Sequence, residues 1–526
     1  MPILHPGVTA VTRAGVVRQE GVRGRGRQWD VAGVLLPQRR GVSPALLVAA
    51  LAAVVRLGLV LASRGGPGGS FGYDASVYYA ASDALLHGRL PYRDFVLLHP
   101  PGLGLALTPF AAVGQLLGDH AGFELGNTCF ALLASANAGL VVVLARRLGV
   151  PSRAALVGGL FSAVWFGAVQ AEISARLEPL GSALLLSGLL LVLPEPVTRR
   201  RLVLGGALLG AAVTVKIWWI VPVALVLAWQ LARRRRAALP VLLGAATAAV
   251  AVMGPFLLAA PGQMLRMVVT DQLGRPTAGY SRVHRLGDLA TVHQAFPRLP
   301  GPVLLVLLVL TALLLLAVVT AAMAAERGRL PASLLLVQLV VLLVAPTYFS
   351  FYSGYLAVSL ALTVALAAGA PGRWTRVGRA GAVGLVAGAV VLTCLAGLVR
   401  SPTFTAPVAG AGTLRQAVAG VPCVVSDSPM LLIELDALSR GLSHPDCPNW
   451  VDATGRTYDL DAPPDGHDED RRNNPVWQAH LRTYLLSGDA VVLFRGATGA
   501  DEGTLAAIRR HPVLVGAGHL TIYRVR

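Results

Sequence analysis

One short polar segment between two apolar runs carries most of the groups that could do chemistry. Residues 71–102, FGYDASVYYAASDALLHGRLPYRDFVLLHPPG, contain three carboxylates, two histidines, two arginines and four tyrosines. Ionisable groups within or beside a membrane are costly and therefore mark candidate functional sites. Asp74, the first of the carboxylates, precedes a short helical pattern. We expect Asp74 to act as a general base that accepts a proton from an acceptor hydroxyl.

A structural role is the competing interpretation of Asp74. Aspartate is favoured at helix N-caps, where its carboxylate accepts backbone N–H bonds. Capping and catalysis are compatible, so this alternative does not exclude the first. The later carboxylates of the segment are expected to be solvated or paired with its two arginines. These residues are Asp83 and Asp94, with Arg89 and Arg93.

The polar segment ends in the run His99-Pro100-Pro101-Gly102. Tandem prolines keep the preceding residue out of helical geometry and give a rigid entry into the next helix. His99 is therefore either a structural hydrogen-bonding group or a contact to a phosphate.

A second polar group lies where one apolar run ends and the next begins. Glu172 and Glu178 flank Arg176 there. They form either an ion-paired cap, with Glu178 just before the proline that opens a helix, or part of a substrate site. Lys216 is alone in another apolar run. Such a lysine usually extends its ammonium to the membrane surface, where it could bind a phosphate as a point charge.

The composition indicates a membrane protein. Of 526 residues, 55% are hydrophobic and 14% are charged, with a mean hydropathy of +0.63. Soluble domains carry about 25% charged residues. Several apolar runs reach the length of about 20 residues that crosses a bilayer. The sequence therefore predicts an all-α polytopic membrane protein that lies in the plasma membrane.

Arginine clusters give the expected topology, because positively charged short loops stay in the cytoplasm. Placing six clusters on that side requires about eleven transmembrane helices, with the N-terminus inside and the C-terminal region outside. In this arrangement residues 201–232 form two short helices that meet near 214–219. Residues 101–118 form a juxtamembrane or re-entrant helix within the outer loop 63–121. The expected spans are 44–62, 122–145, 153–170, 179–194, 202–215, 217–231, 238–259, 302–323, 331–346, 352–370 and 378–399.

Two further regions are expected on the outer side. Loop 260–301 carries five arginines, which either bind anionic headgroups or follow the lipid surface; they are Arg266, Arg275, Arg282, Arg285 and Arg298. The aromatic residues at 348–355 are expected to be mostly interface anchors.

The net charge of +18 does not indicate a nucleic-acid partner, because the arginines form short patches and no continuous basic domain. Residues 1–43 are basic, interrupted by Gly and Pro, and lack an apolar core. We expect them to form a disordered cytoplasmic tail. The transmembrane domain then covers 44–399.

Residues 400–526 are expected to form a small extracytoplasmic α/β domain. Cys423 and Cys447 both lie there, and a disulfide between them is allowed if the domain is outside the cell. Acceptor binding and shielding of an outer cavity are its candidate roles. The expected strands are 421–426, 490–494 and a pair within 513–525; the expected helices are 430–439 and 501–510, and 452–474 is expected to be a flexible loop.

Together these features resemble the GT-C superfamily of membrane glycosyltransferases, which use polyprenyl-phosphate sugars and include mannosyl- and arabinosyltransferases. The resemblance rests on the order of these features along the chain and on the side of the membrane where we expect them. It covers about 44–370 and the C-terminal region. The segments that carry it are Gly72-Tyr73-Asp74, Pro91-Tyr92-Arg93-Asp94-Phe95, His99-Pro100-Pro101-Gly102 and Ala175-Arg176-Leu177-Glu178-Pro179.

The resemblance implies that Asp74 is the catalytic base and that a hexosyl or pentosyl group is transferred with inversion on the outer face. The donor is then a polyprenyl-phosphate sugar, and the acceptor is a hydroxyl of a glycan, lipid or protein. The leaving lipid phosphate develops charge that cations must stabilise. The expected donor-phosphate and substrate contacts are Arg176, Lys216, His99, Glu172 and Glu178.

One departure from the family pattern matters. Some members have a second acidic residue beside the loop aspartate, whereas Ala75 and Ser76 follow Asp74 here. We therefore expect no metal ligand and no cofactor. The alternatives are a transporter or flippase for a lipid-linked molecule and a noncatalytic envelope-assembly subunit. Transporters place polar groups at the bilayer midplane in repeated halves, and the sequence shows no such repeat.

Overall fold

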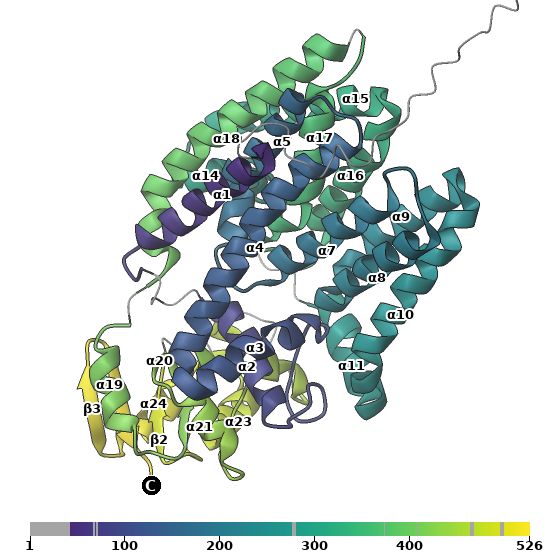
Figure 1. The fold of residues 1–526 in the computed structure, drawn as a ribbon. Coiled ribbons are helices and arrows are strands. Elements are labelled where there is room, and N and C mark those ends of the chain that lie inside the picture. The colour runs from purple at the N-terminus through teal and green to yellow at the C-terminus, as the bar shows by residue number, and fades with distance from the viewer. Residues whose placement is uncertain are drawn as a thin grey trace, which may run out of the picture. The chain divides into compact units, whose positions relative to one another are not determined.

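Helices dominate the chain after residue 43, and a small sheet forms near its C-terminus (Figure 1). The computed structural model describes residues 43–66, 69, 72–275, 280–372, 374–406, 408–462, 468–494 and 499–526. Residues from Pro44 to Arg526 form one compact unit. The predicted cytoplasmic tail, apart from Ser43, lies outside the described residues.

A bundle of apolar helices makes up most of this unit. Seven of the described helical segments are long and apolar enough to cross a membrane. A helix satisfies its own backbone polar groups, which is why long apolar segments take this form in lipid. The bundle consists of α1 (Pro44–Leu61), α4 (Asp119–Arg147), α5 (Ser152–Val164), α6 (Phe166–Ala171), α7 (Leu177–Val192), α8 (Arg199–Val215), α9 (Ile220–Arg233), α10 (Arg235–Ala259), α15 (Gly301–Ala324), α16 (Arg329–Val344), α17 (Ala357–Ala368) and α18 (Trp374–Phe404).

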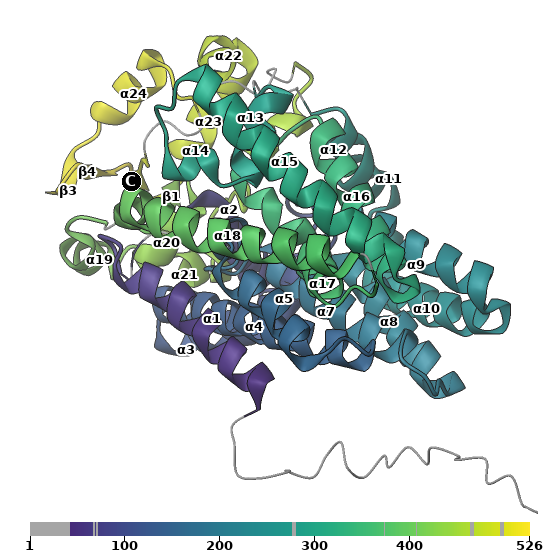
Figure 2. The same ribbon diagram turned by 90° about the horizontal axis from the view of Figure 1, so that it is seen from above.

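Each of the eleven expected spans overlaps one or two of these helices. The span 153–170 is divided between α5 and α6, and α8 and α9 are separated by Lys216 and the short 3-10 turn η2 (Ile217–Trp219). Figure 2 shows α1, α5 and α18 packed side by side. Seven segments meet the length and composition of a span, so the total of eleven stays a prediction.

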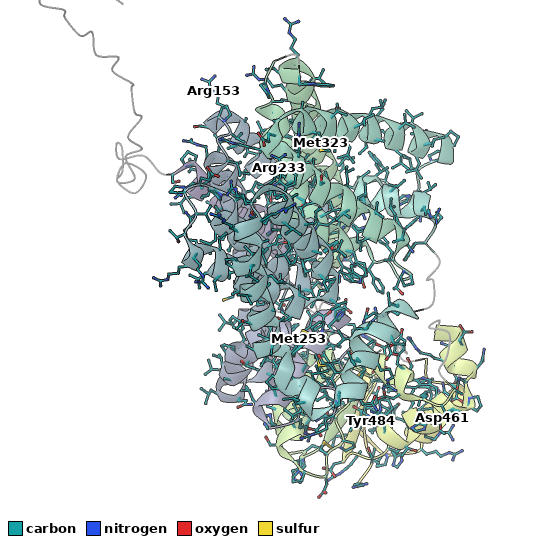
Figure 3. The ribbon with its side chains drawn as sticks, turned by 90° about the vertical axis from the view of Figure 1, so that its right-hand side faces the viewer. Arg153, Arg233, Met253, Met323, Asp461 and Tyr484 are labelled. Carbon is teal, nitrogen blue, oxygen red and sulfur yellow. A yellow bond between two sulfur atoms is a disulfide. The ribbon has the colours of Figure 1, made fainter. Side chains whose placement is uncertain are left out.

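The arginine-rich loops meet at one end of the bundle. Arg153 and Arg233 both lie at the end away from Tyr484 and Asp461 (Figure 3). Polar contacts join four of these loops to one another, which agrees with the prediction that their arginines lie on a single side. The contacts between loops are Arg327 to the carbonyl of Leu148, Arg233 to Glu326 and Arg234 to Glu195, and Arg146 contacts Ser152 within one of the loops.

The opposite end carries α2 (Tyr73–Leu86), α3 (Gly102–Leu117) and the C-terminal sheet (Figure 1). The sheet order is β1-β2-β4-β3, with β1 parallel to β2 and the other pairs antiparallel. The strands are β1 (Val424–Ser426), β2 (Ala490–Val492), β3 (Val513–Ala517) and β4 (Leu520–Arg524), all within the expected strand segments. Six helices accompany them: α19 (Ala411–Val418), α20 (Pro429–Glu434), α21 (Leu438–Ser443), α22 (Asp468–Asn473), α23 (Pro475–Leu485) and α24 (Glu502–Arg509).

The C-terminal region differs from the sequence prediction in several places, including the unexpected helices α19 and α23. The expected helix 430–439 is broken into α20 and α21 at Asp436, whose φ of 50° lies in the left-handed region. The expected flexible loop 452–474 contains the 3-10 turn η6 (Gly455–Asp459) and α22. The prediction of a loop rested on Asp, Pro and Gly content, which also occurs in short capped turns.

Polar side chains join α2 and α4 to the C-terminal region. The hydroxyl of Ser439 lies 2.6 Å from Asp83 and 2.7 Å from Asp119. Asp83 is fully buried and also accepts a hydrogen bond from Gln115, so the expectation that it is solvated or paired with an arginine was wrong. Asp94 does pair with its neighbouring arginine, at 2.8 Å.

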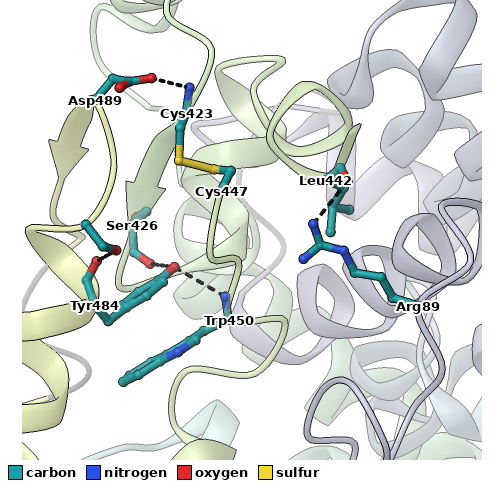
Figure 4. The surroundings of a disulfide bond; sticks show 9 residues. Arg89, Cys423, Ser426, Leu442, Cys447, Trp450, Tyr484 and Asp489 are labelled. Carbon is teal, nitrogen blue, oxygen red and sulfur yellow. Dashed lines mark hydrogen bonds between the residues drawn. A yellow bond between two sulfur atoms is a disulfide. The ribbon is translucent and has the colours of Figure 1, made fainter. Parts of the chain in front are cut away.

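A disulfide joins Cys423, just before β1, to Cys447, which follows α21 (Figure 4). This is the pair of cysteines that the sequence analysis singled out. The hydroxyl of Tyr484 donates to the carbonyl of Ser426 at 3.0 Å, and its ring stacks on Trp450 at a centroid distance of 4.1 Å. The chain after Cys447 is therefore held against β1 and α23.

We predict that Cys423→Ser and Cys447→Ser each lower the free energy of unfolding of the C-terminal region by about 3 kcal/mol, because the lost cross-link closed a loop in the unfolded chain. Pulse proteolysis in urea, on the full chain in lipid nanodiscs, measures this change. Cys394→Ser is the control, since Cys394 is exposed and unpaired in the structure. Equal stability of all three variants would contradict the prediction.

Candidate active site

Asp74 lies in the first turn of α2, one residue past its start. The N-cap is Gly72, with a φ of 91° that favours glycine. The competing interpretation of Asp74 as an N-cap was therefore wrong. A carboxylate in the first turn still interacts favourably with the helix N-terminus. A Cβ added at Gly72 would lie 3.8 Å from Arg176, so the start of α2, which carries Asp74, lies close to this cation.

Asp74 faces a cavity of about 280 Å³ between the bundle and the C-terminal region, called here the Asp74 cavity. Four predicted site residues line it: Asp74, His99, Arg176 and Glu178. Glu172 and Lys216 are not among its lining residues. The other lining residues are Tyr73, Val77, Tyr78, Leu97, Leu98, Leu177, Arg275, Thr347, Phe349, Phe351, Tyr352, Asp452, Thr454, Gly455, Tyr458 and Arg471.

Glu172 pairs with Arg56 of α1, and both side chains are buried. Arg56 also donates to the carbonyls of Ser162 and Ala163, at 3.4 and 3.3 Å. Glu172 therefore neutralises a buried cation that fastens α1 to the junction of α5 and α6. Its predicted role as a substrate contact does not fit this placement, because the carboxylate is occupied away from the cavity.

Lys216 forms a buried ion pair with Glu178, with 3.0 Å between Nζ and Oε1. Both side chains are 2% exposed. The ammonium also lies 4.3 Å from the ring centroid of Trp218 and 3.9 Å from that of Tyr352. Lys216 was expected to bind the donor phosphate directly. In the structure its ammonium instead contacts Glu178 and the rings of Trp218 and Tyr352 and holds them in place.

Three arginines line the Asp74 cavity. Arg176 lies over the ring of Phe351, at 4.3 Å from the centroid. Arg275 lies near Tyr352. Arg275 was expected only as one member of an arginine-rich loop, and Arg471 was not expected at all. Together with Lys216 these residues supply four cations, against the three carboxylates of Asp74, Glu178 and Asp452.

The other arginines of loop 260–301 do not behave as one surface. Arg285 is buried and donates to the carbonyl of Ala345 at 2.6 Å and to that of Leu342 at 3.1 Å. These carbonyls belong to the end of α16, so Arg285 caps a helix C-terminus, where a cation is favourable. Arg266 pairs with Asp459 of the C-terminal region.

The aromatic residues at 348–355 are mainly core residues. Tyr348 and Tyr355 are fully buried, and Tyr352 is 5% exposed. The hydroxyl of Tyr355 donates to the carbonyl of Trp218 at 2.8 Å. The prediction that most of them anchor the chain at the membrane interface was wrong, because the 3-10 segment η5 (Ser350–Leu356) turns their rings onto the bundle.

Asp452 is the main site residue that sequence reasoning missed. Its Oδ1 accepts hydrogen bonds from the Tyr73 hydroxyl at 2.9 Å and from the backbone of Gly455 at 2.7 Å. The Tyr73 hydroxyl in turn accepts one from the backbone N–H of Thr454 at 2.9 Å. The run Asp-Ala-Thr-Gly is typical of a turn closed by an aspartate side chain, and that signal was available in the sequence.

Burial and nearby charges set the protonation of the site. Burial raises the pKa of Asp74 from its ordinary value; Arg176 opposes this shift, Asp452 adds to it, and Arg275 opposes it. Burial also lowers the pKa of His99 well below its ordinary value, and the nearby cations Arg275 and Lys216 add to the effect. The His99 imidazole is therefore neutral, while Asp74 is a stronger base than a solvated carboxylate.

One group among the described residues could hold a metal ion. His284, Asp288 and His293 place ligand atoms within 4.8 Å of one another. They lie on α13 (Arg282–Leu289) and α14 (Val292–Ala295), and none of them lines the Asp74 cavity.

This helical bundle, with its polar cavity beneath a small C-terminal domain, has the GT-C fold, as the sequence resemblance predicted. The chain matches the crystal structure of ArnT from Cupriavidus metallidurans bound to undecaprenyl phosphate, with a TM-score of 0.58 and 15% identity over 91% of this chain and 98% of that one. It also matches the Archaeoglobus fulgidus oligosaccharyltransferase in complex with Zn and sulfate, with a TM-score of 0.52 and 13% identity over 86% of this chain and 68% of that one. No protein-family model and no curated protein sequence matches the chain.

We predict that Lys216→Met lowers the free energy of unfolding by about 3–5 kcal/mol, because it leaves the buried Glu178 carboxylate unpaired. The double variant Glu178→Leu/Lys216→Met should recover part of this loss. Reversible unfolding in mixed micelles of sodium dodecyl sulfate measures both values.

The exposed pair of Arg233 and Glu326 is the control for this prediction. Arg233→Met should cost less than about 1 kcal/mol, as for other surface ion pairs. Equal losses for Lys216→Met and Arg233→Met would show that the buried pair does not stabilise the fold.

Proposed function

We propose that this protein is a membrane glycosyltransferase that moves a hexosyl or pentosyl group from a polyprenyl-phosphate donor to an acceptor hydroxyl, with inversion. The observation that carries the proposal is the Asp74 cavity, in which one carboxylate base shares a 280 Å³ space with three arginines. The GT-C fold supports the proposal, since the matched ArnT structure holds undecaprenyl phosphate.

The cations of the cavity suit a lipid-phosphate donor. Arg176 and Arg275 reach the cavity from the start of α7 and from the end of the segment after α12 (Asp271–Leu273). Guanidinium groups bind phosphate oxygens through paired hydrogen bonds. The donor phosphodiester carries one negative charge and becomes a dianion as the sugar leaves, and fixed cations stabilise the added charge when water is excluded.

Asp74 supplies the base for the transfer step. The acceptor hydroxyl gives its proton to the Asp74 carboxylate while its oxygen attacks the anomeric carbon. The bond between that carbon and the donor phosphate oxygen breaks, and the electron pair leaves with the phosphate. A single direct displacement inverts the configuration at the anomeric carbon, and no nucleotide-binding domain is needed because the donor arrives in the lipid.

Orientation in the plasma membrane follows from the charge asymmetry of the bundle. Arginine-rich short loops remain in the cytoplasm, and these loops lie at the end away from the C-terminal region. We therefore infer that the Asp74 cavity and the C-terminal domain are extracytoplasmic. The disulfide is consistent with an oxidising compartment.

A transporter or flippase for a lipid-linked molecule remains the second candidate class, with a noncatalytic assembly subunit as the third. A transporter needs a substrate path across the bilayer midplane. The charged groups of the Asp74 cavity gather at one end of the bundle, which favours transfer over transport. Both alternatives tolerate the loss of a catalytic base, and this separates them from the proposal.

We predict that Asp74→Asn lowers sugar transfer by about 10²–10⁴-fold, the usual contribution of a general base. Membranes that contain the variant are incubated with a panel of radiolabelled polyprenyl-phosphate sugars, and label in the acceptor fraction is counted. Asp461→Asn, which alters an exposed aspartate that does not line the cavity, is the matched control and should retain activity. Full transfer by Asp74→Asn at normal abundance would remove Asp74 as the base.

The pH profile of kcat/KM provides a test of the electrostatics around Asp74. The base works only when ionised, so the rate falls as the pH drops through its raised pKa. Arg176→Gln should move this acid limb to higher pH, because Arg176 opposes the rise. Asp452→Asn should move it to lower pH, because Asp452 adds to the rise. Shifts in the same direction for both variants would contradict the assignment of the limb to Asp74.

A further inference from the structure

We infer that a second cavity, next to the first, binds a carbohydrate acceptor. This inference rests on the proposed transfer reaction and names the chemical class of its acceptor. The cavity has a volume of about 220 Å³ and lies between the polar segment after α2 and the C-terminal domain. It is called here the Trp450 cavity. The lining residues used in the argument are Arg89, Asp94, Asn449, Trp450, Asp452 and Arg456.

Asn449 is the first sign that this cavity receives a polar ligand. Its side chain is 9% exposed, and among the described residues neither its amide nitrogen nor its oxygen has a hydrogen-bond partner. A buried polar group without a partner costs about 1–3 kcal/mol. Both atoms are closed off from solvent in the structure, so a ligand with adjacent hydroxyls reaches them only when the Asn449 side chain turns toward the cavity; a hydroxyl can then donate to the oxygen and accept from the nitrogen.

Trp450 gives the cavity an aromatic wall that is fixed in advance. Its ring stacks on Tyr484 with an interplanar angle of 4°, and its backbone N–H donates to the Tyr484 hydroxyl at 3.4 Å (Figure 4). The disulfide at Cys447 lies just before this segment. Because the ring is already held in one place, binding a ligand does not carry the entropy cost of fixing this side chain.

Two arginines and two aspartates line the cavity, so its positive and negative charges balance. Their guanidinium and carboxylate groups are planar and can form hydrogen bonds. Arg456 bonds Asp459 at 2.8 Å, and its guanidinium lies 6.0 Å from the Trp450 ring centroid. Arg89 donates to the carbonyl of Leu442 at 3.1 Å. Two arginines and two aspartates suit a neutral ligand rich in hydroxyls. Phe95, Val96, Pro448 and Val451 also line the cavity, so its lining is partly apolar.

Asp452 connects the two cavities, because it lines both of them. Its contact with the Tyr73 hydroxyl places it beside the residue that precedes Asp74. A sugar held against Trp450 can therefore present a hydroxyl past Asp452 toward the base. Asn449 and Trp450 act as acceptor-binding residues in this arrangement, while Asp452 positions the hydroxyl.

The test uses the full chain in lipid nanodiscs that contain no glycoside detergent. Saturation-transfer NMR measures binding of two probes, an α-linked mannobiose and an α-linked arabinobiose. Retention of radiolabelled undecaprenyl phosphate is measured on the same samples. The variants are Trp450→Ala and Asn449→Leu, and the control is Trp229→Ala, which removes a partly exposed indole near Arg233 of α9.

We expect at least one disaccharide to bind, with at least tenfold weaker binding to Trp450→Ala and Asn449→Leu and unchanged binding to Trp229→Ala. Undecaprenyl phosphate should bind all four proteins equally, which also shows that the variants are folded. Failure of both disaccharides to bind, or equal binding to every variant, would overturn the carbohydrate site. Disaccharide binding that depends on Trp450, without any binding of undecaprenyl phosphate, would instead overturn the proposed donor.

Discussion

The buried ion pair between Lys216 and Glu178 is the interaction on which the geometry of the site depends. Lys216 interrupts the chain between α8 and α9, and Glu178 opens α7. Because each charge would cost several kcal/mol if left alone in this surrounding, the three helices can meet in only a narrow range of arrangements. The rings of Trp218 and Tyr352 contact the same ammonium and extend this constraint to η5.

The same pair also determines which charges remain available to a ligand. Glu178 reaches the Asp74 cavity but is already neutralised by Lys216. Arg176, Arg275 and Arg471 then face Asp74, Asp452 and any anion that enters this cavity. In the proposed reaction Asp74 must accept a proton while the arginines contact the phosphate, although all of these groups line one cavity. Burial raises the pKa of Asp74, whereas Arg176 and Arg275 oppose that rise and are also cations that a phosphate could contact, so one arrangement serves both needs.

Much of the fold could be predicted from the sequence, because long apolar runs and arginine clusters reflect the membrane directly. The break at Lys216 is an example, since two arginine clusters bounded a segment too short for two full spans. Asp74 and Arg176 were also identified, as charged residues beside apolar runs. Partner choice was less predictable. Glu172 was expected beside the substrate, but its partner Arg56 lies 116 residues away in the sequence, and no local pattern shows such a contact.

The C-terminal residues of the site show a second limit of sequence reasoning. Asp452 and Asn449 lie in a polar segment whose composition is that of a loop. Their role in the site depends on how this segment packs against α2. Tyr73 makes this docking specific, because its hydroxyl joins Asp452 and Thr454 within one residue of the base. In the proposed transfer, a membrane-embedded donor and a water-soluble acceptor must approach from different surroundings. The C-terminal domain meets both requirements, because it contributes residues to the Asp74 cavity and also lines the Trp450 cavity. Asp452 lines both cavities and lies where they meet.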